Sequence, residues 1–354
     1  MKNIIYVVDK KDSASHTAAS ARVAMSGGEI LIANEYISTL HLLKSIDKKK
    51  GGIILFCWRK VLADILSSRK SVDYYKSLDN KFAFAFLIPD HLGLESRFEN
   101  FDLIMIKASD YYVVTSQLLF NEYSFKYPAL RPKFIFHDLP DINLIEKIRE
   151  NNPRKTHSGI KIIWVGNSTW GHRQGFKDHK GFKSVLKPLI LEITRIGNCC
   201  DVKVIDSATE YVPQHKVLKQ IRDSDILLQT SKNEGTGLTI LEALGLGTNV
   251  VTSKVGIALE LLNEDHFLKT LEADAIHRQI HKLVSQTDQE YLYEKFHEHT
   301  SRSRTESLMI FKKNKIFPSK FLMKQVLLIK LYWIYRYILR RFSRNRSGVK
   351  AGAK

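Results

Sequence analysis

The chain has few cysteines, and no segment has the features of a secretion signal. Its 354 residues include only 3 cysteines, Cys57, Cys199 and Cys200. An odd count without regular spacing argues against a disulfide scaffold and favours a reducing compartment. The first apolar run, Ile4–Val8, is too short for a signal peptide and is not followed by a small-residue cleavage site. We therefore expect a cytoplasmic protein.

Several functional signatures are also lacking. No group of cysteines and histidines has the spacing of metal ligands, and no stretch repeats with a fixed period. No recognised nucleic-acid-binding motif is present either. The sequence thus predicts a metal-independent protein without a resident cofactor.

Acidic residues are outnumbered by basic ones. The chain has 55 lysines and arginines against 37 aspartates and glutamates, a formal net charge of +18. Such a balance draws a protein to a polyanion or to an anionic membrane face. Nucleic acid is the less favoured of these partners, because no motif supports it.

Part of this charge lies in the last segment, 316–354, which we expect to form a basic amphipathic helix over 317–344 and then a disordered tail. Lys324, Lys330 and Arg336 interrupt the apolar run, so an interfacial helix fits better than a bilayer-spanning one. This predicts peripheral attachment to the inner face of the cell membrane. The alternative is a helix that packs on its own protein. On such a helix one face would carry Leu327, Leu331, Ile334, Tyr335, Ile338 and Phe342.

Apolar runs alternate with helical stretches along most of the chain, which predicts two doubly wound parallel sheets. The polar stretch Glu150–Ser158 is the expected linker between a domain at 1–150 and a second at 159–315. Expected helices include Tyr36–Ile46, Val61–Ser67 and Phe182–Ile193. Expected strands are Ile4–Val8, Ile53–Trp58, Phe82–Ile88, Tyr112–Thr115, Lys133–Phe136, Ile160–Val165, Val202–Ile205, Ile226–Gln229 and Asn249–Thr252.

The most informative stretch is 233–251, NEGTGLTILEALGLGTNVV. Glu234 and Glu242 stand eight positions apart, on either side of a glycine turn and the start of a helix. Gly235 and Gly237 would let the backbone approach a ligand closely. The free N–H groups of Gly237, Leu238 and Thr239 would then face an anion, most naturally a diphosphate. With strands before and after it, the stretch predicts a βαβ unit whose ligand lies at the carboxyl ends of the strands.

This stretch resembles the Glu-x7-Glu signature of the retaining nucleotide-sugar glycosyltransferases of family four, which have the GT-B fold of two Rossmann-like domains facing a cleft. Thr236 stands in place of an aromatic residue, and Asn249 in place of a proline. The resemblance implies that Glu234 contacts the donor sugar and Glu242 the ribose hydroxyls. The matching residues are Ser231, Glu234, Gly235, Gly237, Leu238, Leu241, Glu242, Ala243, Gly247, Val250 and Val251.

A second motif opens the second half. The strand that ends at Gly166 runs into a basic loop and then into Lys180-Gly181. It resembles the family's V-G-R…K-G segment, whose arginine and lysine neutralise the donor diphosphate. Lys180 matches that lysine, Asn167 stands where the arginine is expected, and Arg173 is the candidate to replace it. The alternative is an ordinary solvated basic loop.

The first domain, 1–150, is the expected acceptor side, and its sequence gives a weaker indication of catalytic residues. The strand Phe84–Ile88 ends at Pro89-Asp90-His91, and a histidine at the carboxyl end of a central strand can face the cleft. We predict a catalytic role for His91, with Asp90 second. His16, in the loop after the first strand, is the rival candidate.

Together these patterns predict a retaining glycosyltransferase. It would move a sugar from a nucleotide-sugar donor to a glycan or lipid-linked acceptor, in bacterial surface polysaccharide or lipopolysaccharide synthesis. Two alternatives stay open. One is a sugar-nucleotide epimerase of the same fold, and the other is a basic nucleic-acid-binding protein, whose binding would fall steeply with salt and would not depend on Glu234.

Overall fold

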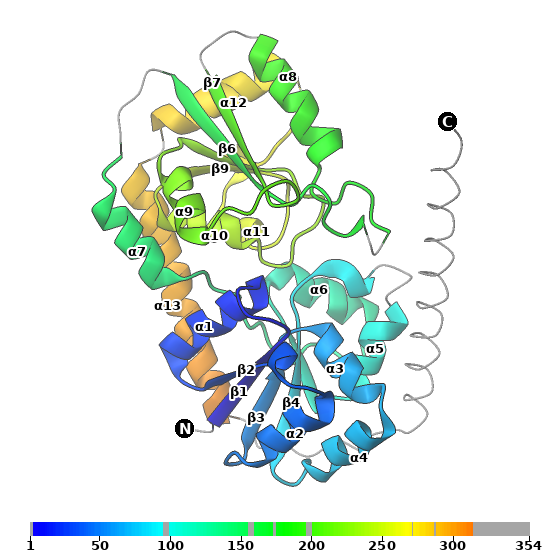
Figure 1. Cartoon of the computed structure of the whole chain (residues 1–354). Coiled ribbons are helices and arrows are strands. Elements are labelled where there is room, and N and C mark those ends of the chain that lie inside the picture. The colour runs from blue at the N-terminus through cyan, green and yellow to red at the C-terminus, as the bar shows by residue number, and fades with distance from the viewer. Residues whose placement is uncertain are drawn as a thin grey trace, which may run out of the picture.

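The chain folds into two α/β domains, each built on a parallel sheet with helices on both faces (Figure 1). The computed structural model describes residues 3–94, 99–154, 159–172, 175–195, 200–270, 272–286 and 288–313. The prediction of two Rossmann-like domains is therefore confirmed. The expected amphipathic helix lies outside the described residues. Within the described part, no helix is both long enough and apolar enough to span a bilayer.

The first domain contains a five-stranded sheet of order β2-β1-β3-β4-β5, in which every neighbouring pair is parallel. Its strands are buried on both faces, which explains why β4 is a continuous apolar run. The strands are β1 (Asn3–Val8), β2 (Glu29–Ile32), β3 (Gly52–Phe56), β4 (Phe82–Ile88) and β5 (Tyr111–Val114). The helices are α1 (Ala14–Ser26), α2 (Thr39–Asp47), α3 (Arg59–Leu66), α4 (Arg69–Ser77), α5 (Glu99–Lys107) and α6 (Gln117–Lys126).

The second domain contains a four-stranded parallel sheet of order β7-β6-β8-β9. Its apolar side chains form a core on each face of the sheet. The strands are β6 (Ile160–Gly166), β7 (Cys200–Asp206), β8 (Ile226–Gln229) and β9 (Asn249–Thr252). The helices are α7 (Ile142–Asn151), α8 (Lys187–Arg195), α9 (Gln214–Arg222), α10 (Leu238–Gly245), α11 (Ala258–Leu261), α12 (Ala273–Gln286) and α13 (Gln289–Lys313).

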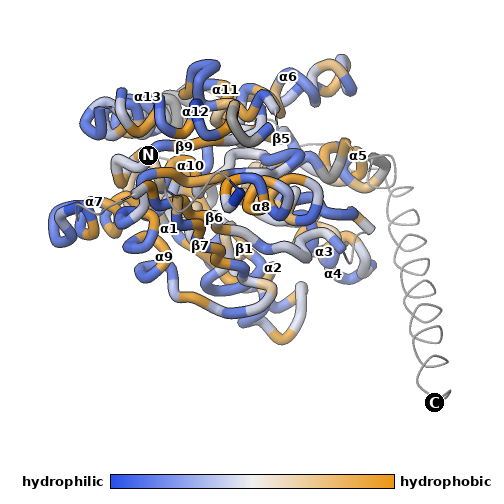
Figure 2. The backbone as a smooth tube through the Cα atoms, turned by 90° about the horizontal axis from the view of Figure 1, so that it is seen from above, coloured by the Kyte–Doolittle hydropathy of each residue, from blue (hydrophilic) through white to orange (hydrophobic). Residues whose placement is uncertain are grey.

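Helix α10 is the most deeply buried helix of this domain. Ile240, Leu241, Ala243 and Leu244 are all fully buried, and Figure 2 shows the helix as a mostly hydrophobic stretch in the interior. It packs between the second sheet and α13. The helix that carries Glu242 is therefore fixed by core packing on several sides.

Two helices connect the domains. Although α7 precedes the predicted linker, Ile145 and Ile148 on it are buried in the core of the second domain. Helix α13 runs along one side of both domains (Figure 1) and contacts α10 in the second and α1 in the first. The exact domain limits stay a prediction.

One strand was missed, one predicted strand was wrong, and one predicted helix is present with an irregular first turn. The edge strand β2 was not expected, because its four residues begin with a glutamate and are too few to show a period. The segment Lys133–Phe136 forms an isolated bridge from Ile135 to Val114 in place of a strand, since only part of its backbone pairs with β5. The helix expected over 182–193 opens with a π-helical turn, Phe182–Leu186, before α8.

Candidate active site between the two domains

A cleft of about 510 Å³ lies where the carboxyl ends of the two sheets face each other. Both domains line it. The second domain contributes the loops after β6, β7 and β8, and the first contributes the loops after β3 and β4 and the start of α1. This is the position at which open parallel sheets bind ligands.

The loop between β8 and α10 holds the residues predicted to bind the donor and is hereafter the donor loop. It enters the cleft, and the lining includes Gly235, Thr236, Gly237, Leu238 and Thr239. Gly237 has a φ of 81°, in the left-handed region, and it precedes the helix without any side-chain cap among the described residues. The first N–H groups of α10 are therefore available to an anion, and the helix dipole favours one there.

Gly235 lies against the backbone of the opposite domain. A Cβ atom at this position would overlap the carbonyl oxygen of Pro89, in the loop after β4. Only glycine permits so close an approach of the two domains here.

Glu234 and Lys180 are ion-paired inside the cleft, although 54 positions separate them in the chain. Gln229 donates a second hydrogen bond to Glu234 Oε1, at 3.0 Å. Burial opposes ionisation of Glu234, but the charge of Lys180 and the hydrogen bonds from Lys180 and Ser231 hold its pKa below the usual value. The site thus keeps a carboxylate and an ammonium group in contact where the donor would lie.

Glu242 is in the second turn of α10, but it is only 8% exposed and is not part of the cleft lining. Gln214 Nε2 donates to its Oε1 at 3.1 Å. Burial raises the pKa of Glu242 to about 7, with Gln214 opposing the rise and Asp141 adding to it. Gln214 therefore already engages one of the two carboxylate oxygens.

The other predicted donor residues differ in how they are placed. Gly166 and Asn167 line the cleft, and Asn167 Oδ1 accepts from the backbone N–H of Thr169 at 3.1 Å. Ser231 is buried beside Gln229, whose Nε2 lies 3.3 Å from its hydroxyl, and it is not part of the lining. Arg173 lies outside the described residues.

His91 and Asp90 line the first-domain side of the cleft, as predicted. His91 Nε2 donates to the carbonyl oxygen of Glu234 at 2.8 Å, and its Nδ1 lies 2.8 Å from a carboxylate oxygen of Glu122. Burial disfavours a charged His91, but Glu122 and the Glu234 carbonyl outweigh burial and raise its pKa above 6.5. Asp90 is held by Arg59 Nη1 at 2.6 Å.

A second contact between the domains lies beside the cleft. The Glu260 carboxylate, on α11, accepts from the first backbone N–H of α6, Gln117, at 2.8 Å. Its other oxygen is 3.3 Å from His137 Nε2 and 3.6 Å from Arg302. Burial would raise the pKa of Glu260, but His137 and the Gln117 N–H lower it.

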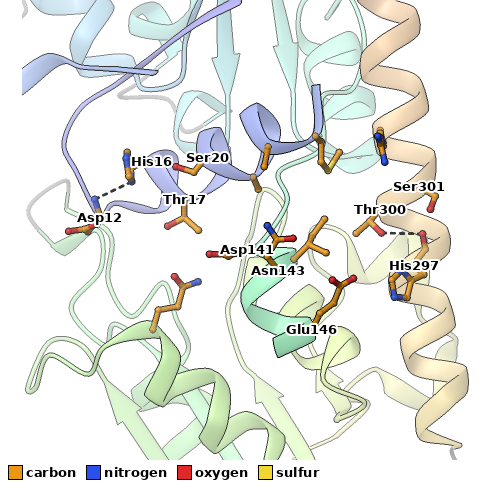
Figure 3. A pocket seen from close by; sticks show the side chains of 16 residues that line it. Asp12, His16, Thr17, Ser20, Asp141, Asn143, Glu146, His297, Thr300 and Ser301 are labelled. Carbon is orange, nitrogen blue, oxygen red and sulfur yellow. Dashed lines mark hydrogen bonds between the residues drawn. The ribbon is translucent and has the colours of Figure 1, made fainter. Parts of the chain in front are cut away.

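The rival histidine, His16, belongs to a different cavity. This cavity, of about 640 Å³, lies between α1, α7 and α13, and Figure 3 shows polar side chains of all three helices pointing into it. His16 Nδ1 accepts a hydrogen bond from the Asp12 N–H at 3.4 Å. Of the two candidates, His91 is therefore the one that reaches the loop between β8 and α10.

Sequence reasoning missed many of the cleft residues, among them Arg22, Trp58 and Asp138. A signal existed for Arg22, because it is a lone charge in the alanine-rich helix α1. Asp138 follows the segment Lys133–Phe136, which was expected to be an ordinary strand. Across the described ranges, no group of three or more potential metal ligands lies together.

A comparison with protein-family models finds a match for the stretch that contains Glu234 and Glu242. Residues 207–301 match the family model of the glycosyl transferases, group 1. This matched stretch begins directly after β7 and ends within α13. The matched residues include the donor loop, α10 and both glutamates. No curated protein sequence matches this chain.

Likeness to solved structures shows that the two domains have the GT-B fold. HepE from Anabaena in complex with UDP is 14% identical, with a TM-score of 0.57 over 89% of this chain and 100% of HepE. A trehalose-phosphate synthase from Burkholderia vietnamiensis is 8% identical, with a TM-score of 0.62 over 88% and 95%. The catalytic domain of starch synthase IV from Arabidopsis thaliana, bound to ADP and acarbose, is 9% identical, with a TM-score of 0.60 over 88% and 99%.

Proposed function

We propose that the protein is a glycosyltransferase that moves a sugar from a nucleotide-sugar donor to a glycan or lipid-linked acceptor, with retention of the anomeric configuration. One observation carries the proposal. The Lys180–Glu234 ion pair and the uncapped start of α10 meet His91, from the other domain, in one cleft. The group 1 match over residues 207–301 supports the same activity.

The donor diphosphate would lie against the start of α10 and Lys180. As the bond to the sugar breaks, negative charge grows on the leaving phosphate, and a fixed ammonium group with helix N–H donors stabilises it. Lys180 would then exchange Glu234 for the phosphate. Arg173 is a further candidate for this role from the sequence, and no metal ion or bound cofactor is required by the scheme.

Glu234 would position the donor sugar. Its carboxylate is already engaged by Lys180 and Gln229, which suits an acceptor of sugar hydroxyl hydrogen bonds better than a free nucleophile. Retention is proposed from the Glu-x7-Glu resemblance. His91 and Asp90 would lie on the acceptor side, where contact between the domains excludes water from the reacting centre.

The test is to incubate the purified protein with a panel of nucleotide sugars and a glycan acceptor mixture, and to measure nucleotide release and product mass. UDP-glucose is a suitable first donor, because HepE was solved with it. The anomeric proton signal of the early product decides between retention and inversion. Conversion of the donor sugar without an acceptor would instead establish an epimerase, and absence of nucleotide binding would refute both.

We also propose that the enzyme works in the cytoplasm on the inner face of the cell membrane, in bacterial surface polysaccharide or lipopolysaccharide synthesis. The net charge of +18 and the basic segment 317–344 support this. A lipid-linked acceptor would be presented on such a surface.

A further inference from the structure

We propose that the first-domain side of the cleft is an acceptor subsite for a neutral pyranose, in which Trp58 supplies a stacking surface and Asp138, held by Arg22, reads hydroxyl groups. The proposal rests on the proposed function, since it names the acceptor class for the same cleft. All three residues line the cleft together with Asp90.

The Arg22–Asp138 ion pair is held in place by several contacts within the first domain. Arg22, on α1, is only 2% exposed. Its Nη2 donates to the carbonyl oxygens of Phe136 and His137, each at 2.7 Å, and to Asp138 Oδ1 at 2.9 Å. Its guanidinium also lies 3.8 Å from the centre of the Phe136 ring. These contacts fix the position of Asp138 at the edge of the cleft.

Hydrogen-bonding capacity is left over in this pair. Arg22 Nε and Nη1 are buried and have no partner among the described residues. Asp138 uses Oδ1 for Arg22, and its Oδ2 accepts no hydrogen bond from the described part of the chain. The two Arg22 nitrogens are closed to solvent, so the group of this pair that can meet a ligand is the Asp138 carboxylate, whose side chain is 13% exposed. A sugar hydroxyl suits it, because a hydroxyl can donate to a carboxylate oxygen.

The charges of these pairs bear on the chemical class of the acceptor. Arg22 is paired with Asp138, while Arg59 is shared by two carboxylates, Asp90 at 2.6 Å and the buried Asp102 at 2.6 Å. No excess positive charge remains at these pairs for a phosphate or carboxylate on the acceptor. Burial raises the pKa of Asp138, with Arg22 opposing it, so the environment also disfavours additional anions. A neutral, hydroxyl-rich ring fits best.

Trp58 provides the apolar surface that such a ring needs. It precedes α3 as its N-cap residue and is partly buried against the first core. The neighbouring Cys57 thiol, whose pKa burial raises to about 12, is influenced by the charges of both Arg22 and Asp138. Cys57 and Trp58, which follow β3, line the same cleft as the pair. An aromatic ring next to planar hydrogen-bonding side chains can bind both the C–H face and the hydroxyl edge of a pyranose.

The experiment uses the full-length protein and whichever nucleotide sugar it turns over. Methyl α- and β-pyranosides serve as minimal acceptors, and glycerol serves as the non-ring polyol control. We expect at least one methyl pyranoside to be glycosylated and to accelerate nucleotide release several-fold, with glycerol inactive. Equal activity of glycerol and all pyranosides, or no activity with any pyranoside, would overturn the subsite.

Substitutions of the proposed residues then test whether they form the acceptor subsite. Asp138→Asn and Trp58→Ala should each raise the KM for the methyl pyranoside about tenfold or more, a loss expected for one buried polar or stacking contact, while the KM for the nucleotide sugar changes less than about twofold. Trp58→Phe should restore much of the acceptor affinity. Asp64→Asn, which removes a carboxylate on α3 that pairs with Lys60 away from the cleft, is the matched control.

Nucleotide binding by isothermal titration separates the possible failures. A folded variant that binds the nucleotide normally but shows no change in acceptor KM would refute the subsite and leave the glycosyltransferase standing. If the wild-type protein binds no nucleotide, the proposed function falls, and the subsite falls with it.

Discussion

The imidazole Nε2 of His91 donates to the backbone carbonyl oxygen of Glu234 across 2.8 Å, so the loop after β4 in one domain touches the donor loop of the other. The residue predicted to act on the acceptor side thus contacts the residue predicted to hold the donor sugar. Closure of the cleft and assembly of the site are, in this arrangement, the same event.

Lys180→Ala should weaken binding of nucleoside diphosphates by about tenfold to a hundredfold, because a charge-assisted hydrogen bond contributes about 1.5–3 kcal/mol. Nucleosides lack the diphosphate and should lose much less. Titration calorimetry with UDP, GDP and ADP, each compared with its nucleoside, measures the difference. Lys180→Arg keeps the charge and is the control. Equal losses for diphosphates and nucleosides would show that the lysine is structural.

Glu242→Gln should make the unliganded protein more stable above pH 7. The folded-state pKa is raised from 4.5 to about 7, so ionising this buried group costs stability as the pH rises through that window. A shift of this size corresponds to about 3 kcal/mol at pH 8, and the difference should vanish below pH 4.5. Urea unfolding at several pH values tests it.

The same Glu242→Gln variant should bind nucleotides more weakly, since the ribose hydroxyls lose a charged acceptor worth about 1.5–3 kcal/mol. A gain in stability with a loss in affinity would be the signature of a carboxylate kept for binding. Unchanged affinity would remove the ribose role from this residue.

His91→Gln should cost more stability at acidic than at alkaline pH. Because the folded-state pKa of His91 is raised, the stabilisation from its charged form is fully present below pH 6.5 and is lost as the pH rises through the folded-state value. Glu122→Gln should remove the same pH dependence. Thermal unfolding across this range measures both variants, and a pH-independent effect would contradict the ion pair.

Gly235→Ala should lower turnover by about tenfold or more, because the new methyl group would overlap Pro89 and hold the domains apart. Small-angle scattering should show a larger radius of gyration. Ser77→Ala, at an exposed position on α4 that does not line the cleft, is the control. Normal turnover in Gly235→Ala would mean that this contact is dispensable.

Truncation after Pro318 should abolish sedimentation with anionic vesicles and leave nucleotide binding intact. Each lysine or arginine near such a surface contributes about 1 kcal/mol, and salt screens the attraction. Neutral vesicles should bind the full-length protein poorly. Loss of folding on truncation would favour the alternative, in which this segment packs on the protein.

The parts of the fold that the sequence predicted are those with a strong local pattern. Phe82–Ile88 is a buried parallel strand, and a continuous apolar run bounded by polar residues identifies it. The strand Glu29–Ile32 lies at the sheet edge and needs no such run. The packing of α7 on the second domain depends on Ile145 and Ile148 meeting residues far along the chain, which no local pattern records.

In the candidate site too, residues that lie in short motifs were predicted, and contacts between distant residues were not. Lys180 and Glu234 were found because each lies in a short motif, but their ion pair joins positions 54 apart and follows from the fold alone. The Arg22–Asp138 pair joins positions 116 apart, and neither residue lies in a motif. Glu242 was predicted to contact the ribose hydroxyls, and its hydrogen bond from Gln214, 28 positions away, was not foreseen.

Helix α13 restricts how the cleft can open. Its 25 residues extend roughly 37 Å, enough to pass along both domains, and it packs on α10 at one part and on α1 at another. A stiff rod fixed to both halves resists their separation and permits mainly a twist about its own axis. Substrate entry would then be a torsional movement, and its barrier would be set by the side chains that pack α13 onto the two domains, among them the buried Leu292 and Phe296.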